Sequence, residues 1–268
     1  MPEAVETEIA AWTTALLLVL PRAAGFFLFL PFFSNQVLPA IAKFSLFTVL
    51  VIPALPHGRA SLAEYAADIG PLSASVLILL LLKESLLGIV VGFATALVFR
   101  VPGMIGDFID NQRGTSIAQV FNPAQGDQSS NLGAFLGQVF IVWFLLSGGL
   151  TSLLALLYES YRVLPPASFL PRFGRESLDA LVAVFIATLH LLVVLAAPMI
   201  FIMMLVDIAL GLANRFAPQL NVFFLAMPIK SVVALFALSL YLAIALRHLG
   251  EVNLTEEPLR RLLEIGAR

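Results

Sequence analysis

The residues of this chain that could do chemistry are few, and they form no known catalytic pattern. His57, His190 and His248 are too far apart in the sequence for a zinc-binding H-E-x-x-H motif. There is no Gly-rich phosphate loop and no G-x-S-x-G motif, and the absence of cysteine excludes thiolate ligands and a cysteine nucleophile. Asp107 and Asp110 could share a helix face, but the sequence supplies no further ligands for a metal. We therefore predict a protein that is not an enzyme and has no cofactor.

Charged residues instead interrupt several apolar runs. Five such charges facing lipid at mid-bilayer would cost about 12 to 17 kcal/mol in total, at about 2.5 to 3.5 kcal/mol each. We expect them to contact protein, although Arg22 and Lys43 could instead extend to a membrane interface. Neighbours on a helix point about 100° apart, so Lys83 and Glu84 should not neutralise each other and should find partners elsewhere. The candidate buried charges, with a role in assembly, are Arg22, Lys83, Glu84, Asp207, Arg215 and Lys230.

Uncharged polar side chains are densest in residues 99–131, between two apolar runs. In so apolar a chain, such a segment should line a pathway, seal one or contact a partner. Apolar residues at helical spacing through 101–109 predict a helix that ends near Gly114, and Asn122-Pro123 predicts a turn in the loop beyond it. An ordinary loop outside the membrane is the alternative. The abundance of amides and glycines in place of charges favours close packing or a gate.

The composition shows what kind of protein holds these residues. Hydrophobic residues make up 60% of the 268 and charged residues 12%, with a mean hydropathy of +0.99. This is far more apolar surface than a soluble domain could cover. A net charge of -2 gives no general attraction for nucleic acid. The first residues, MPEAVETEIAAW, lack the basic region of a cleaved signal, so we expect the first apolar run to be retained.

Six apolar runs predict an all-α integral membrane protein. Leu132–Tyr158 and Ala180–Val206 contain no Asp, Glu, Lys or Arg, and a helix of that length reaches about 40 Å, more than the hydrocarbon thickness of about 30 Å. The runs are too long, and lack the alternation, for barrel strands. Without a repeat or a linker, one domain over residues 1–268 is expected. The runs are 9–33, 37–56, 72–99, 132–158, 178–206 and 216–246.

Prolines and glycines modify these helices. Two small-residue pairs, Gly88-x3-Gly92 and Gly133-x3-Gly137, predict faces where another helix can approach closely. Prolines within or beside apolar runs predict helices that bend or stop, which membranes tolerate where other protein satisfies the freed carbonyls. Together they indicate hairpins of broken helices packed against neighbours, including other subunits. The prolines are Pro21, Pro31, Pro39, Pro53, Pro198 and Pro228.

Several strings, in order along the chain, are similar to one known family. They are LPFF at 30–33, DNQRGTS at 110–116, LGLANRFAPQLNVF at 210–223 and FLAMPIKS at 224–231. In them the chain resembles the T subunit of the type III secretion export apparatus (SctT), the relative of flagellar FliR. The string FLAMPIKS favours the injectisome branch. Asn122-Pro123 departs from the acidic residue plus proline typical of the family, which puts a charge role there in doubt.

The resemblance implies a structural subunit of a helical, hetero-oligomeric export gate in the bacterial inner membrane. One copy would join several SctR (FliP-like) and SctS (FliQ-like) subunits, with SctU (FlhB-like) also a partner, and the gate would be raised toward the periplasm. Helical hairpins would surround a channel for unfolded protein substrates, closed by a plug loop within about 100–131. The implied plug residues are Asp110, Gln112, Arg113, Gly114, Ile117, Val120, Phe121, Asn122 and Pro123.

Two further inferences remain open. The alternative function is an ion-coupled secondary transporter with coupling charges at Lys83, Glu84, Asp207 and Lys230, although the chain shows no two related halves. The distribution of arginine predicts a cytoplasmic carboxyl-terminal tail, residues 247–268. Assuming six serial spans, eight arginines lie on the side that holds both termini and three lie on the other.

Overall fold

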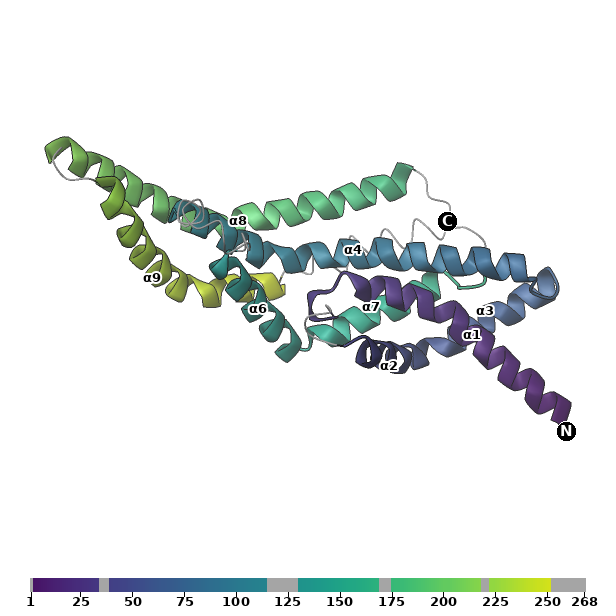
Figure 1. Cartoon of the computed structure of the whole chain (residues 1–268). Coiled ribbons are helices and arrows are strands. Elements are labelled where there is room, and N and C mark those ends of the chain that lie inside the picture. Colours follow the sequence, from purple (N-terminus) through teal and green to yellow (C-terminus); the bar gives the residue numbers. More distant parts are fainter. Residues whose placement is uncertain (1, 34–38, 115–129, 169–174, 218–221, 252–268) are drawn as a thin grey trace. The chain divides into compact units, whose positions relative to one another are not determined.

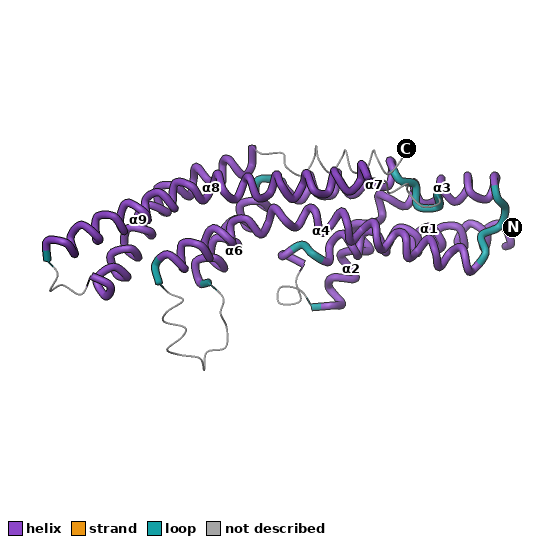
Figure 2. Tube along the Cα trace, turned by 90° about the horizontal axis from the view of Figure 1, so that it is seen from above, coloured by secondary structure: helices purple, strands orange, loops and turns teal. Residues whose placement is uncertain are grey.

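The structure is a computed structural model that describes residues 2–33, 39–114, 130–168, 175–217 and 222–251. Every regular element in these ranges is a helix (Figure 2), which confirms the predicted all-α class. The chain divides into two compact units. Helices α4 (Ala74–Gln112) and α8 (Arg175–Phe216) each contribute residues to both units. The single domain over 1–268 therefore stays a prediction.

The first unit comprises the described residues within 1–98 and 147–185. Helix α1 (Pro2–Leu28) lies against α2 (Ala40–Val51) and α3 (Leu55–Asp68), and α3 contacts α7 (Gly149–Val163) (Figure 1). Short 3-10 turns, η1 (Pro31–Phe33) and η2 (Ile52–Ala54), join these helices. Phe27 of α1 stacks on Phe47 of α2 with ring centroids 5.2 Å apart. The core of this unit is therefore built on α1.

The second unit comprises residues 99–146 and 186–253. It holds the end of α4, helix α6 (Asn131–Leu146), most of α8 and helix α9 (Val222–Glu251), and α6 packs on α9. Phe99 contacts Phe140 and Phe144, with centroids 5.6 and 4.9 Å apart. Buried residues recur along α8 every three or four positions, the spacing of one helix face. They include Thr188, Leu191, Leu195, Met199 and Met203.

Within the described ranges, five helical segments are long and apolar enough to cross a membrane, or six if α6 and α7 are counted as one interrupted span. The run Leu132–Tyr158 was expected to form one helix, and this is wrong. Helix α6 ends at Leu146 and α7 begins at Gly149. Gly148 between them has φ +83°, a left-handed conformation that glycine adopts without steric cost. Between the predicted apolar runs 37–56 and 72–99 the chain is also helical, since α3 continues as far as Asp68.

Half of the named prolines do not stop a helix. Helices α1, α8 and α9 continue through Pro21, Pro198 and Pro228. One lost backbone bond does not end a long helix whose other turns remain paired. Pro31 and Pro39, in contrast, stand at the start of η1 and directly before α2, where a missing N–H costs nothing.

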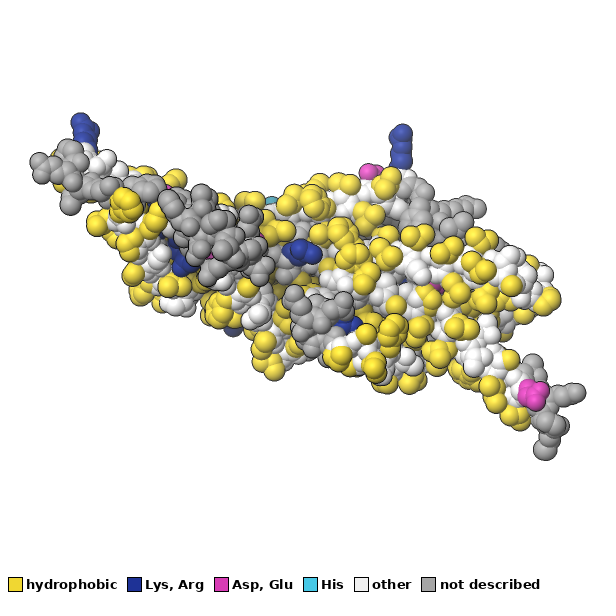
Figure 3. All heavy atoms as spheres, in the orientation of Figure 1, with side chains coloured by type: hydrophobic (Ala, Val, Ile, Leu, Met, Phe, Trp, Pro, Cys, Tyr) yellow, Lys and Arg dark blue, Asp and Glu magenta, His cyan; other side chains and the backbone are white. Residues whose placement is uncertain are grey.

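Much apolar surface stays exposed on each unit. Hydrophobic side chains make up most of the face in Figure 3, and charged side chains appear at few places on it. Along α9, an exposed row at intervals of four residues includes Val232, Phe236, Leu240 and Ile244. Such area on a soluble monomer would be exceptional. Lipid or other protein must cover it.

Candidate functional site

The first cluster of candidate residues is a buried ion pair in the first unit. Arg22 of α1 donates to both carboxylate oxygens of Glu84 in α4, Nε to Oε2 at 2.7 Å and Nη2 to Oε1 at 2.8 Å. The two side chains are 1% and 0% exposed. A bidentate guanidinium–carboxylate pair is the strongest form of such a contact. Both charges are thus neutralised inside the chain.

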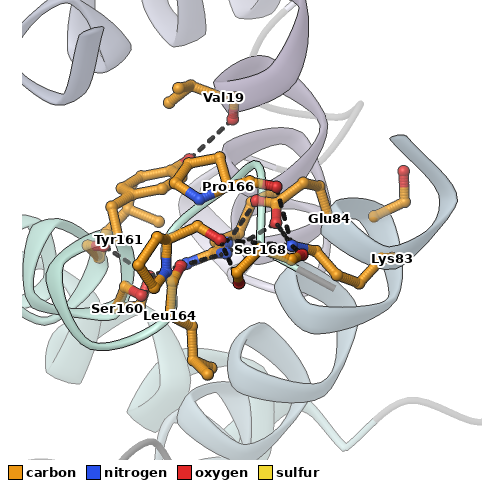
Figure 4. Close-up of polar contacts among 12 residues, drawn as sticks. Val19, Lys83, Glu84, Ser160, Tyr161, Leu164, Pro166 and Ser168 are labelled. Atoms are coloured by element: carbon orange, nitrogen blue, oxygen red, sulfur yellow. Dashed lines mark hydrogen bonds and ion pairs between the residues drawn. The ribbon is translucent and has the colours of Figure 1, made fainter. Parts of the chain in front are cut away.

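Lys83 joins the same carboxylate. Its Nζ lies 2.9 Å from Glu84 Oε1 and donates to the carbonyls of Pro166 and Ser168 at 2.8 and 2.9 Å (Figure 4). The prediction that Lys83 and Glu84 cannot pair is therefore wrong. The flexible four-carbon stem of lysine spans the angle between adjacent helix positions. The expectation that these charges contact protein is met within the chain itself, which supplies partners for Arg22, Lys83 and Glu84.

The two cations together bind the carboxyl-terminal end of α7. Arg22 Nη1 donates to the Ser160 carbonyl at 2.6 Å, and Nη2 donates to the Leu164 carbonyl at 2.8 Å. The Ser160 carbonyl also accepts the Leu164 N–H at 3.0 Å, and carbonyls at the end of a helix carry partial negative charge, so a cation there is stabilising. Leu164 and Ala167 are buried although their backbone is not helical. The cluster therefore satisfies irregular backbone inside an apolar unit.

Tyr161 completes this cluster. The Arg22 guanidinium lies 4.6 Å from the centre of the Tyr161 ring, a cation–π distance. The Tyr161 hydroxyl donates to the Val19 carbonyl at 2.7 Å, which adds a further hydrogen bond between α7 and α1 (Figure 4). Sequence reasoning assigned Tyr161 no contact.

Glycines allow α1 and α4 to come this close. A Cβ at Gly88 would collide with the Arg22 carbonyl oxygen, and one at Gly92 would collide with the backbone of Phe26. On the facing helix, a Cβ at Gly25 would lie 2.8 Å from the Ser85 carbonyl. Gly88 and Gly92 were predicted as packing positions, whereas Gly25 was missed because its partner glycines lie on another helix.

The second cluster lies at the carboxyl end of α4, in the second unit. Asp110 is 4% exposed, pairs with Arg113, and accepts hydrogen bonds from Ser130 Oγ at 2.6 Å and Leu132 N at 3.0 Å. Helix α4 ends at Gln112, and Gly114 has φ +79°. The prediction of a helix end near Gly114 is therefore confirmed.

A third ion pair joins α8 to α9. Lys230 Nζ lies 2.5 Å from Asp207 Oδ1 and donates to the Gln112 carbonyl at 3.2 Å. The Lys230 side chain is 13% exposed and that of Asp207 is 48% exposed. Arg215, in the last turn of α8, is exposed. These charges are thus less enclosed by their own chain than Arg22, Lys83 and Glu84.

Other predicted residues have different outcomes. Gly133 contacts α4, with its added Cβ 2.9 Å from the Gly103 carbonyl, whereas a Cβ at Gly137 would meet no described atom within 4 Å. His190 is exposed on α8. No group of His, Asp or Glu that could hold a metal occurs in the described ranges. Five predicted plug residues lie outside them, namely Ile117, Val120, Phe121, Asn122 and Pro123.

Comparisons with known proteins place the chain in a family. Residues 13–254 match the model of the bacterial export proteins, family 1. The chain is 33% identical over 256 residues to the Yop proteins translocation protein T of Yersinia pestis, which covers 92% of this chain and 94% of that protein. It is 32% identical over 244 residues to the secretion system apparatus protein SsaT of Salmonella typhimurium, covering 90% and 92%.

A flagellar protein is also similar. The flagellar biosynthetic protein FliR of Bacillus subtilis is 30% identical over 258 residues, covering 94% of this chain and 95% of that protein. The matches extend over nearly the whole of each protein, so they concern the complete helical arrangement rather than one motif. They confirm the resemblance recognised in the sequence, and the chain belongs to the bacterial export proteins of family 1.

Proposed function

We propose that this chain is a channel-forming structural subunit of a type III secretion export gate, which passes unfolded protein substrates across the bacterial inner membrane. The observation that carries the proposal is the match to secretion proteins over nearly their full length, including 94% of the Yop translocation protein. A likeness of that extent involves every helix of the chain.

The distribution of charge and apolar surface supports a role as a subunit. Arg22 and Glu84 are satisfied within the chain, so the first unit needs no partner to neutralise them. Large apolar side chains such as Phe224 and Phe236 are 69% and 66% exposed. A chain that neutralises its deepest charges but leaves long helices uncovered is suited to packing among other helices and lipid.

The finer assignments belong to the same proposal. SctR, SctS and SctU type subunits are the partners, and the carboxyl-terminal tail from 247 lies on the cytoplasmic side. The gate serves an injectisome: two of the relatives above are named for translocation or secretion, and FLAMPIKS at 224–231 resembles that branch. The segment within 100–131 plugs the closed channel.

Purification of the native complex tests the assembly. Mild solubilisation of membranes from the source bacterium, followed by affinity purification through this chain, should recover SctR- and SctS-type subunits in fixed ratios. A self-sufficient monomer or dimer with no co-purifying subunit would contradict the proposal and favour the ion-coupled transporter instead. Deletion of the gene should abolish protein secretion and leave motility intact. Loss of motility alone would assign the chain to a flagellar gate.

Deletion of Thr115 to Phe121 tests the plug. In an assembled complex the deletion should raise the leakage of ions or small solutes across the membrane, because part of the seal is missing. Phe121→Ala should raise it less, since neighbouring contacts remain. Wild-type conductance with normal complex abundance would remove the plug assignment and leave the rest of the proposal intact.

A further inference from the structure

The joint between α4 and α6 is a feature that the proposed function does not use. A Cβ at Gly106 of α4 would collide with the backbone of Gly133 in α6, and a Cβ at Gly103 would lie 3.7 Å from the Gly133 carbonyl. The two helices therefore touch through their main chains. This contact lies where α4 nears its end and α6 begins.

The start of α6 is capped from two sides. Ser130 Oγ accepts the Gly133 N–H at 2.8 Å, and the Ser130 carbonyl accepts the Ala134 N–H at 2.9 Å. The Leu132 N–H, which a helix cannot pair internally, is donated to Asp110 Oδ2 at 3.0 Å. Ser130 is therefore the local cap, and the carboxylate of another helix supplies the remaining acceptor.

Asp110 is placed to hold both helices at once. Its Oδ2 atom receives the Ser130 hydroxyl as well as the Leu132 amide, while Oδ1 pairs with Arg113 of its own helix segment. A carboxylate at a helix N-terminus also interacts favourably with the partial positive charge there. The side chain is almost fully enclosed, so water competes little for these donors.

We propose that Asp110 is the positioning residue of this joint, locking the carboxyl end of α4 onto the amino end of α6. The lock holds Ser130 and Leu132, at the start of α6, against the last turn of α4. This assigns Asp110 a role distinct from a seal in the channel. It depends only on contacts within the second unit, and would hold whether or not the chain serves export.

Thiol labelling tests the proposal, since the wild-type chain has no cysteine. Leu132 is 7% exposed, so a Leu132→Cys reporter in native membranes should react slowly with N-ethylmaleimide. Adding Asp110→Asn keeps the side-chain shape but removes the charge and one acceptor. We expect at least tenfold faster labelling, equivalent to about 1.4 kcal/mol of local opening. Ser130→Ala should give a smaller increase.

Arg100→Gln is the control, because Arg100 is an exposed charge on the same helix, ten residues before Asp110. Its labelling rate should stay within twofold of the parent. The proposal is overturned if Asp110→Asn also stays within twofold, or if Arg100→Gln accelerates labelling as much. If Leu132→Cys fails to accumulate, hydrogen exchange of residues 131–136 in the purified complex gives the same comparison: faster exchange in Asp110→Asn alone supports the joint, and equal exchange contradicts it.

Discussion

Two arginine–glutamate pairs in the first unit have nearly the same chemistry in opposite surroundings. Arg22 and Glu84 are 2.7 Å apart, and Arg59 and Glu8 are 2.9 Å apart. Each guanidinium lies 4.6 Å from an aromatic ring centre, Tyr161 for Arg22 and Trp12 for Arg59. The first pair is 1% and 0% exposed, and the second 41% and 66%.

The difference shows that burial, rather than contact geometry, determines what an ion pair does. Water can solvate Arg59 and Glu8 if their contact breaks, so the contact adds little. No water replaces the partners of Arg22, so a break leaves a charge in an apolar interior. Arg22 also donates hydrogen bonds to two carbonyls at the end of α7. Among the described residues, the exposed pair has no equivalent bonds. The buried pair therefore determines the fold of its unit.

The largest effect should come from Glu84→Ala. It leaves Arg22 and Lys83 buried beside each other without the carboxylate they share, at a cost of about 3 to 5 kcal/mol. We expect severe loss of the subunit from the membrane, measured by quantitative immunoblot of membrane fractions. Assembly and secretion should fall because the chain itself misfolds.

A double variant sharpens this prediction. Arg22→Met with Glu84→Met removes one cation together with the carboxylate, so less uncompensated charge remains than in the Glu84 variant. Membrane abundance should be higher than expected from the two single variants combined. Additive losses would show that the two residues act independently, contrary to their bidentate contact.

The next largest effect should come from Gly88→Ala. The new methyl group would overlap the Arg22 carbonyl oxygen, forcing α1 and α4 apart at the buried pair, at about 1 to 3 kcal/mol. Gly137→Ala is the control. Its Cβ meets no described neighbour, and replacing a helical glycine should stabilise α6 by about 0.5 to 1 kcal/mol. In thermal denaturation of the purified complex, the midpoint should fall for Gly88→Ala and rise for Gly137→Ala. A lower midpoint for Gly137→Ala would reveal a partner packed against Gly137.

Lys230→Met should have an intermediate effect. Lys230 is mostly covered, but its partner Asp207 is half exposed, so water or another subunit can compensate the carboxylate. We expect membrane abundance near the wild-type level and a smaller fraction of the subunit in the complex, measured by native gel electrophoresis. A loss of abundance as large as that of Glu84→Ala would mean that the degree of burial within the chain does not determine how much each charge contributes to stability.

The sequence was sufficient to predict the helical membrane class and to single out Arg22, Lys83 and Glu84 as charges that need protein partners. Charge inside an apolar run is a strong signal, because lipid is so poor a solvent for it. The identity of the partners was not predictable. Two partners of Arg22 are the backbone carbonyls of Ser160 and Leu164, and because every residue has a carbonyl, the sequence does not mark these two. The contact of Lys83 with Glu84 depends on the rotamer of the lysine side chain, which the sequence does not specify.

The break at Gly148 was missed for a related reason. The residues on both sides are as apolar as a single span requires, so hydropathy alone indicates one helix. The left-handed φ of Gly148 interrupts the helix locally. Glycine alone does not predict such a break, because Gly88 and Gly92 lie within the uninterrupted helix α4. Asp110 was identified, but as part of a plug. Its bond to the start of α6 depends on a contact across twenty-two residues that no local pattern encodes.

The smallest effect should come from Arg59→Ala, which completes the comparison of the two pairs. The substitution removes the 2.9 Å contact with Glu8 and the guanidinium over Trp12, both at an exposed site. Exposed pairs contribute about 0.2 to 1 kcal/mol, and exposed cation–π contacts about 0.5 to 1 kcal/mol, so the summed loss is well below that of Glu84→Ala. Membrane abundance should be unchanged, and the thermal midpoint of the purified complex should fall slightly at low salt and less at high salt, because salt screens exposed charges. A salt-independent loss comparable to that of Glu84→Ala would mean that the Arg59 pair is buried in the assembled complex, and the contrast between the two pairs would then apply only to the isolated chain.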